Sequence, residues 1–517
     1  MSKEYDVIVI GAGNGGLIAA AYAAKNGLKT LMVERHNIPG GCATSFKRGR
    51  FEFEASLHEL ATYGGEGAEG RVGQYFEELG VDADLYPIND CFTAIMAYPD
   101  KPPYKVVMPN GREEFIATLG KFSPGSEESV RAMFELGDEC IEAWGYMQEH
   151  INDLDHKDLE EKFPNFIRVA YRSVNEVFNA LEIPEEAQRI IKTYWSYIGI
   201  PTNEFDFTFY SFLLLSYIDH HAWLPKSRSH GMSTAIEQAF RNWGGEMWYN
   251  TTVDEILMED GKACGIRVGD KEIRAKQIIG NINPHVVYSK MMKPENVPER
   301  AVKLANSRTQ GVSGVTVYYG LNASPEEIGI TDYSVFCNVA PPEMMFQKFG
   351  MFDPDQMAGV LNCPNLVIPN YTEEGTCILW ATTLLRPGTF DNVTPEEYFK
   401  VKERMAYSFA GFYKMITGID ILPYIEEVEV ATPVTFARYL STPGGSIYGY
   451  QGQMWDNAVP RLLNYKEENY TENLTFCGGH SFSMDGYSSA MDTGKVASAV
   501  VLEKFKERPG IVREGGR

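Results

Sequence analysis

The sequence lacks any apolar run long enough to cross a bilayer. The longest run, within FYSFLLLSYI at residues 209–218, falls well short of the ~18–20 residues that a spanning helix needs. There is also no stretch for a signal peptide, because Met1-Ser2-Lys3-Glu4 leads directly into the first predicted strand. We therefore expect a cytoplasmic protein without a transmembrane segment, for which transient membrane contact is still possible.

Positive charge is also scarce. Lysine and arginine together number 47, against 70 aspartate and glutamate residues, which gives a net charge of −23. A nucleic-acid interface needs a basic surface, so this balance argues against a nucleic-acid partner and against strong attachment to an anionic bilayer. The sequence contains no internal repeat and no low-complexity tract, so we do not expect a repeat architecture.

Cysteine pairs at metal-binding spacing are absent. The eight cysteines, at positions 42, 91, 140, 264, 337, 363, 377 and 477, form no C-x-x-C motif. We therefore expect reduced, mostly buried thiols and no metal site. At 517 residues and 44% hydrophobic composition the chain is long enough for two or three domains with large cores.

The sequence begins with a dinucleotide-binding pattern, YDVIVIGAGNGGLIAAAYAAKNGLKTLMVE. A β-branched strand over residues 5–10 runs into a G-x-G-x-x-G turn, then an alanine-rich helix over 17–25 and a second strand over 29–34. The order strand, glycine turn, helix and strand is that of a βαβ unit. The residues of the turn are Gly11, Ala12, Gly13, Asn14, Gly15 and Gly16.

The glycines of this pattern each have a physical role. Gly11 allows the tight turn, Gly13 leaves room for a pyrophosphate beside the backbone, and Gly16 lets helix and strand pack closely. The helix N-terminus offers free N–H groups to the phosphates. Glu34, at the end of the second strand, is placed to accept hydrogen bonds from both ribose hydroxyls, and Arg35 is the next candidate for this contact. The negative charge of Glu34 disfavours a 2′-phosphate.

The residues after Glu34 separate the possible dinucleotides. Pro39-Gly40-Gly41-Cys42 forms a glycine loop where a simple NAD enzyme would continue with another βα unit. This loop, and the block WLPKSRSHGMSTAIEQAFRNWGGEMWYNTTVDEI that follows later, resemble the flavoprotein superfamily of phytoene desaturases, carotenoid isomerases, retinol saturases and flavin amine oxidases. The resemblance implies that Gly40, Gly41 and Cys42 approach a cofactor, and that the Val253 backbone touches its adenine end.

The closing stretch NLTFCGGHSFSMDGYSSAMDTG carries the same resemblance. It implies FAD, because a chain that returns at its C-terminus to hold the flavin ring is what this long cofactor requires. Two departures from the family pattern stand out. Gly479 stands where the family usually has an acidic residue after the first glycine. The usual G-V-P-G turn is replaced by Gly486-Tyr487-Ser488-Ser489, which suggests that Tyr487 lies beside the ring.

The predicted fold class is α/β, a Rossmann-type FAD-binding domain with a mixed α+β substrate-binding domain. The order of the motifs predicts a discontinuous FAD-binding domain from residues 1–85, 225–300 and 440–510. Residues 86–224 and 301–439 would then form the substrate-binding domain, with a helical subregion at about 123–220.

The candidate catalytic residues are His220 and His221 in a substrate-binding segment, Tyr448 in the stretch GGSIYGYQGQ, and Tyr487 in the closing turn. Asp219 is a candidate to orient one of the histidines. Close by, a dense aromatic segment predicts either a domain core or the wall of an apolar channel; its members are Phe205, Phe207, Phe209, Tyr210, Phe212, Tyr217 and Trp223.

The leading hypothesis is an FAD-dependent oxidoreductase that acts on C–C or C=C bonds of a polyene, prenyl lipid or unsaturated fatty acid. Desaturation, saturation and redox-neutral isomerisation all remain open. A flavin amine oxidase is the first alternative, because tyrosines can hold an amine. A non-enzymatic prenyl-lipid carrier of the same fold is the second. The oligomeric state and the electron acceptor are not determined by the sequence.

Overall fold

The N-terminal segment folds as a βαβ unit. The computed structural model describes residues 4–65, 68–484 and 486–506. β1 (Glu4–Ile10) leads through the glycine turn into α1 (Asn14–Lys25), and β2 (Thr30–Val33) pairs parallel to β1. Every residue of α1 from Leu17 to Ala24 is buried, because its alanines allow close approach on all sides.

Distant segments complete the first sheet. Its strand order is β11-β2-β1-β14-β13-β12, with β20 also paired to β14. β14 (Lys271–Gly280) runs parallel to β1; β13 (Lys262–Val268) pairs with its first half, and β20 (Leu474–Phe476) pairs with its end. β11 (Glu246–Trp248) and β12 (Glu255–Glu259) are the edges. The fold class predicted from the sequence is therefore confirmed.

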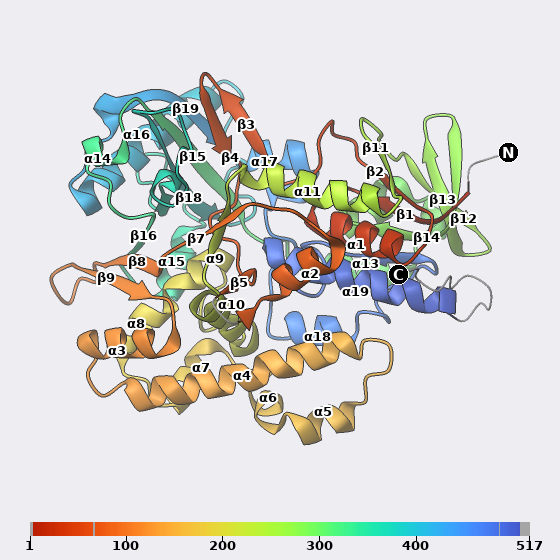
Figure 1. Ribbon diagram of the computed structural model, residues 1–517, viewed down its shortest axis with the longest axis horizontal. Helices are drawn as coiled ribbons and strands as arrows, with labels where there is room; N and C mark the ends of the chain where they lie inside the picture. Colours follow the sequence, from red (N-terminus) through yellow and green to blue (C-terminus); the bar gives the residue numbers. More distant parts are fainter. Residues whose placement is uncertain (1–3, 66–67, 485, 507–517) are drawn as a thin grey trace.

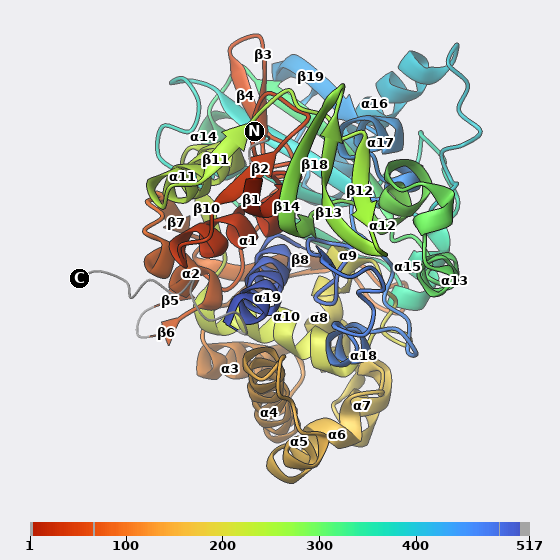
Figure 2. The ribbon, with the colours of Figure 1, turned by 90° about the vertical axis from the view of Figure 1, so that its right-hand side faces the viewer.

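The two ends of the chain pack together. α19 (Tyr487–Lys506) lies along α1, and α11 (Arg228–Asn242) packs on α1 as well. Figures 1 and 2 show α1 in red beside α19 in blue. At Gly494 a Cβ atom would lie 2.2 Å from the Gly15 carbonyl oxygen, so the two helices approach at backbone contact.

A second seven-stranded sheet lies on the other side of the molecule, at the upper left of Figure 1. Only β16 and β8 pair parallel, and the other neighbours are antiparallel. Its strands, in spatial order, are β19 (Ile425–Ala431), β15 (Ser313–Leu321), β18 (Cys377–Leu385), β17 (Val360–Asn362), β16 (Ser334–Asn338), β8 (Asp90–Met96) and β9 (Tyr104–Pro109).

Helices form a third layer below both sheets in Figure 2. They are α3 (Arg112–Phe122), α4 (Glu127–Glu149), α5 (His156–Lys162), α6 (Pro164–Val169), α7 (Val174–Ala180), α8 (Glu185–Ile191) and α10 (Phe207–His220), whereas α9 (Trp195–Ile198) lies higher, at the level of β8. The predicted domain boundaries stay a prediction. Parts of the predicted segments, at residues 1–3, 66–67, 485 and 507–510, lie outside the described residues.

Shorter elements connect these layers. They are β3 (Ser45–Arg48), β4 (Phe51–Glu54), β5 (Gly64–Gly65), β6 (Ala68–Glu69), α2 (Arg71–Leu79), β7 (Leu85–Pro87), β10 (Trp223–Pro225), α12 (Pro284–Val286), α13 (Glu299–Ser307), α14 (Pro325–Ile328), α15 (Pro342–Lys348), α16 (Tyr398–Thr417), α17 (Pro433–Leu440) and α18 (Ala458–Leu463). None of the helices among the described residues is long and apolar enough to cross a membrane.

Candidate functional site

The glycine turn forms a cradle at the N-terminus of α1. Gly11 has φ +94°, a conformation that glycine adopts without strain. No side chain caps α1, so the N–H groups of its first turn are left for a ligand. Asn14 Oδ1 is buried without a hydrogen-bond partner in the described part of the chain. These features fit a bound pyrophosphate.

Asn281, which follows β14, packs into the cradle and was not identified from the sequence. Its Nδ2 donates to the Gly11 carbonyl at 3.2 Å. A Cβ atom at Gly13 would lie 2.8 Å from Asn281 Nδ2, and one at Gly478 would lie 2.3 Å from Asn281 Oδ1. The side chain therefore joins the N-terminal turn to the C-terminal segment. Only the fold brings residue 281 to the turn, so no local pattern marks it.

Glu34 is fixed at the end of β2 by two backbone amides. Its Oε2 accepts from Ala12 N at 2.7 Å and its Oε1 from His36 N at 2.8 Å. A carboxylate oxygen accepts more than one hydrogen bond, so both oxygens keep capacity for ribose hydroxyls. The Arg35 guanidinium donates to the Ser441 hydroxyl and to the Arg438 carbonyl.

Replacing Glu34 with alanine is expected to weaken FAD binding by about 1–3 kcal/mol, the scale of hydrogen bonds to a charged group. The absorption spectrum of bound FAD should hardly change, because the ribose lies far from the ring. Titration of the apoprotein with FAD measures the affinity. Glu34→Gln, which keeps one acceptor oxygen, should lose less. An unchanged affinity in Glu34→Ala would move the ribose contact to another residue.

The loop at residues 40–42 lies against the glycine turn. Gly40 N donates to the Ala12 carbonyl at 2.7 Å, and Gly40 has φ +113°. Burial raises the pKa of Cys42 to about 12, so this residue remains a thiol and is not an activated thiolate. The Cys42 carbonyl accepts from the Ser56 hydroxyl at 3.0 Å and from the Tyr487 hydroxyl at 3.0 Å.

The C-terminal segment closes the same site from the other side. Gly478 N donates to Thr493 Oγ1 at 2.7 Å, which ties the turn after β20 to α19. The helix α19 begins at Tyr487, within the closing turn. Ser488 Oγ donates to the Ala61 carbonyl at 2.7 Å. The segment therefore meets both the 40–42 loop and the chain after β4.

One cavity of about 700 Å³ joins these parts, a volume within the range of ligand pockets. Most of the predicted cofactor residues line it; Ala12 and Gly16 do not. Ala12 instead binds Glu34 through its N–H, and a Cβ atom at Gly16 would lie 2.1 Å from the Gly11 carbonyl oxygen. The lining members are Gly11, Gly13, Asn14, Gly15, Glu34, Arg35, Gly40, Gly41, Cys42, Val253, Gly478, Gly479, Gly486, Tyr487 and Ser488.

The far part of the cavity has apolar walls built by the second sheet and by α10. Of the aromatic segment singled out in the sequence, Phe209, Phe212 and Tyr217 line the cavity. Phe205, Phe207 and Tyr210 are buried in the core of the helical layer instead. The other apolar lining residues include Trp195, Ile198, Leu213, Phe336, Met345, Phe349, Val360, Leu384, Phe436 and Ile447. The segment is thus both core and channel wall.

His220 and His221 do not line this cavity. His220 continues the stripe of Phe209, Leu213 and Ser216 along α10, but it lies one turn beyond Ser216, at the end of the helix. Its carbonyl accepts from Trp223 Nε1 at 2.8 Å. Asp219 is held by the Arg112 guanidinium. The proton role predicted for His220 and His221 is therefore not supported by their position.

Tyr448 does line the cavity, beside Gly449, Gly479 and His480. Two hydrogen bonds between polar side chains lie behind this side of the cavity. His480 Nε2 contacts Asn283 Nδ2 at 2.9 Å, and the Tyr450 hydroxyl contacts His285 Nδ1 at 2.8 Å. Burial lowers the pKa of His480 to about 4, so the ring is neutral.

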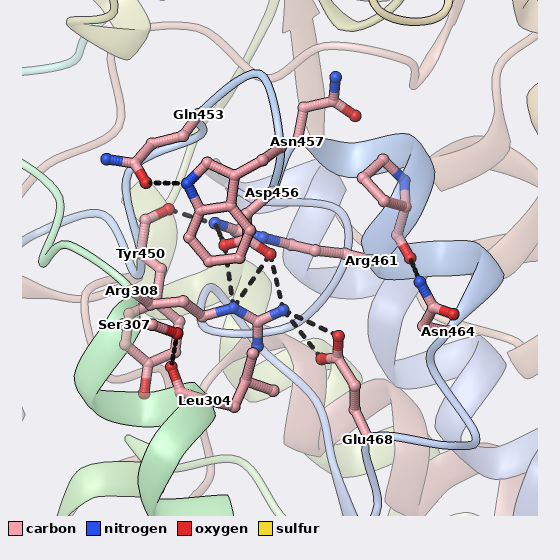
Figure 3. A network of polar contacts seen from close by, with 12 residues as sticks. Leu304, Ser307, Arg308, Tyr450, Gln453, Asp456, Asn457, Arg461, Asn464 and Glu468 are labelled. Atoms are coloured by element: carbon pink, nitrogen blue, oxygen red, sulfur yellow. Dashed lines mark hydrogen bonds and ion pairs between the residues drawn. The ribbon is translucent and has the colours of Figure 1, made fainter. Parts of the chain in front are cut away.

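A buried ionic network anchors the loop that carries Tyr450 (Figure 3). Arg308 lies between Asp456, at 2.8 Å, and Glu468, at 2.9 Å. Arg461 Nη2 reaches the second oxygen of Asp456 at 2.7 Å and donates to the Gln451 carbonyl at 3.1 Å. The network ties this loop to the end of α13 and holds that wall of the cavity in place.

A titratable pair near the apolar end was also missed in the sequence. His58 and Glu59 follow β4 and line the cavity. His58 Nε2 contacts Thr382 Oγ1 at 3.0 Å, and burial lowers the pKa of His58 to about 4. Burial raises the pKa of Glu59 to about 8. The motif SLHEL has no distinctive spacing, so the sequence alone does not mark either residue.

Replacing Tyr487 with phenylalanine is expected to leave FAD content whole and to lower turnover less than about tenfold. The hydroxyl is already engaged by the Cys42 carbonyl and by Ser56 Oγ at 2.9 Å, which suits a positioning role. Ser56→Ala removes a partner of that hydroxyl and should have a similar effect. A loss of about 10²–10⁴-fold in Tyr487→Phe alone would instead mark a proton donor.

Comparison with known proteins adds three findings. Residues 9–79 match the family of NAD(P)-binding Rossmann-like domains. Prolycopene isomerase 1, chloroplastic, from an Oncidium hybrid cultivar is 25% identical over 97% of this chain and 85% of its own length. The all-trans-retinol 13,14-reductase of Danio rerio is 24% identical over 97% of this chain and 86% of its own length.

Solved structures show the same fold at lower identity. An oxidoreductase from Methanosarcina mazei superposes with TM-score 0.60 at 14% identity, over 96% of this chain and all of that one. Putrescine oxidase bound to putrescine gives TM-score 0.61 at 12% identity, over 97% of this chain and 99% of that one. The homologues are enzymes, so the carrier alternative is not supported. The chain is an FAD-dependent oxidoreductase homologous to prolycopene isomerases and all-trans-retinol 13,14-reductases.

Proposed function

We propose that this protein changes C–C or C=C bonds in a polyene or similar long apolar substrate. The observation that carries the proposal is the continuous cavity, which extends from the glycine turn past Tyr487 to walls of Phe209, Phe336 and Leu384. Bound FAD would supply hydride acceptance or donation at one end of this space. The relatives, a prolycopene isomerase and an all-trans-retinol 13,14-reductase, agree with that chemistry.

The chain's own residues hold and shield the substrate. Apolar side chains from α10 and β16 exclude water, and the sheet residues Thr316 and Thr382 offer hydroxyls bonded to each other at 3.0 Å. The neutral rings of His58 and His480 add no charge to the apolar space. Such a site favours an uncharged carbon chain.

We also propose where the protein is located and how the substrate enters the cavity. All eight cysteines are free, which agrees with a reducing compartment and with our proposal of a cytoplasmic enzyme. A long apolar substrate partitions into lipid, so we propose transient membrane contact during loading. We also propose the division into a cofactor domain and a substrate domain at the boundaries expected from the sequence.

Anaerobic photoreduction of the FAD, followed by mixing with a panel of polyenes, enones and unsaturated fatty acids, tests the proposal. Reoxidation of the flavin by one class identifies a saturase. Product analysis by chromatography detects an isomerase, which leaves the flavin spectrum unchanged. Hydrogen peroxide release on addition of amines, with no change in any polyene, would instead support the amine oxidase alternative.

A further inference from the structure

Glu59 occupies an unusual position on the cavity wall. It follows β4 and lies close to Tyr194 and Tyr197, on the side of the cavity formed by α9, α10 and β16. The residue is 7% exposed. Burial raises the pKa of its carboxyl group to about 8, and only neighbouring hydroxyls, of Tyr197, Tyr194 and Ser334, oppose that shift. At neutral pH Glu59 is therefore mostly an uncharged acid.

The hydrogen bonding of this acid is incomplete. Glu59 Oε2 accepts from the Tyr194 hydroxyl at 3.3 Å. The Tyr197 hydroxyl lies close enough to the Glu59 carboxyl group to oppose the rise of its pKa, but Glu59 Oε1 and the Tyr197 hydroxyl are both buried and form no hydrogen bond of normal geometry with each other or with any other residue that the structure describes. Both residues line the cavity. A buried polar atom without a partner is destabilising, so two such atoms on one wall suggest a missing polar ligand.

Aromatic rings surround the two polar atoms. The Tyr197 ring lies 5.2 Å from Tyr194, 5.1 Å from Phe336 and 5.9 Å from His58, measured between centroids. The surroundings thus combine an apolar enclosure with one acid and one phenol. An uncharged acid and a phenol can each donate and accept a hydrogen bond, as a ligand hydroxyl can.

We propose that Glu59 and Tyr197 form a hydrogen-bonding subsite for the hydroxyl group of an otherwise apolar substrate. The proposal rests on the proposed function for the apolar part of that substrate. A carboxylate ligand would bring a second charge-bearing acid into an apolar enclosure, and an ammonium ligand would require Glu59 to ionise there. A neutral hydroxyl satisfies both unpartnered atoms without burying a charge.

The test is a binding titration of the oxidised holoenzyme, in which the change in flavin absorbance reports binding. The probes are all-trans-retinol, its deoxy analogue with a methyl group in place of CH2OH, and retinylamine. We expect wild-type protein to bind retinol about 10- to 100-fold more tightly than the deoxy analogue, the effect of one or two buried hydrogen bonds. Glu59→Leu and Tyr197→Phe should reduce this ratio, to near one for Glu59→Leu.

Two controls separate recognition from packing. Glu59→Gln keeps a donor and an acceptor, so it should retain most of the preference. Tyr217→Phe alters a ring on the same cavity whose hydroxyl donates to the Glu59 main-chain carbonyl at 3.4 Å, and it should keep the full ratio. Stoichiometric FAD in each variant shows that the fold is intact.

Three results would overturn the subsite. Equal binding of retinol and its deoxy analogue to wild-type protein would refute it and leave the proposed function standing. Tighter binding of retinylamine than of retinol would assign Glu59 to a cation. Binding of none of the three would refute the subsite, whereas the proposed function fails only if no member of the panel of polyenes, enones and unsaturated fatty acids is changed.

Discussion

Gly13→Val protein is expected to purify without yellow colour, because its side chain would occupy the space of the pyrophosphate beside the α1 N-terminus. Gly13 has φ −75° and ψ 173°, which valine adopts, so the backbone itself does not resist the change. The FAD content per polypeptide, measured by absorbance after denaturation, should fall from about one to near zero.

Asn281 provides the control for this variant, because its side-chain amide is the nearest protein group to a Cβ atom placed at Gly13. An amide at the end of a side chain can move aside, so this contact alone should not prevent folding. The double variant Gly13→Val with Asn281→Ala removes the contact and should remain colourless. Recovery of FAD in the double variant would show that Gly13 makes room for Asn281 and not for the cofactor.

Asp456→Ala is expected to lower the free energy of unfolding by about 3–5 kcal/mol, because it leaves Arg308 and Arg461 without their shared buried carboxylate. The Asp456 side chain is 5% exposed and that of Arg461 2%. Urea unfolding of the holoenzyme, followed by tyrosine and tryptophan fluorescence, measures the change.

A surface ion pair gives the comparison for this variant. Lys262 and Glu472 are joined at 2.7 Å, but both side chains are more than half exposed. Glu472→Ala should therefore cost at most about 1 kcal/mol. If Asp456→Ala is no more destabilising than Glu472→Ala, the network of Figure 3 contributes little and another contact must hold the Tyr450 loop.

The sequence predicted the cofactor half of the molecule because local patterns carry it. The βαβ unit depends on glycine spacing and on the alanine-rich helix, and both are properties of neighbouring residues. The closing turn was located by resemblance, and α19 indeed begins at Tyr487. In the second sheet all nine residues of β15 are buried, so this strand shows no alternation of buried and exposed residues.

The substrate half depends on contacts between distant residues, which a single sequence does not reveal. Glu59 meets Tyr194 and Tyr197 only after the chain that follows β4 packs against residues 194–197, and Asn281 reaches the glycine turn only through β14. His220 had the right residue type, but the length of α10 carries it past the cavity. Helix length and strand register, not composition, decided these positions.

The pairing of β1 with β14 and of β14 with β20 has a consequence for synthesis of the chain. The first half of the cofactor site leaves the ribosome early, whereas β20 and α19 emerge last. At about 5–20 residues per second, β1 waits roughly 25–90 s for the strand that completes its sheet. During that interval the apolar faces of β1 and α1 lack their final partner, and FAD cannot yet be enclosed. Cofactor insertion should therefore be a late event, and the newly made chain should depend on protection against aggregation until its last helix is released.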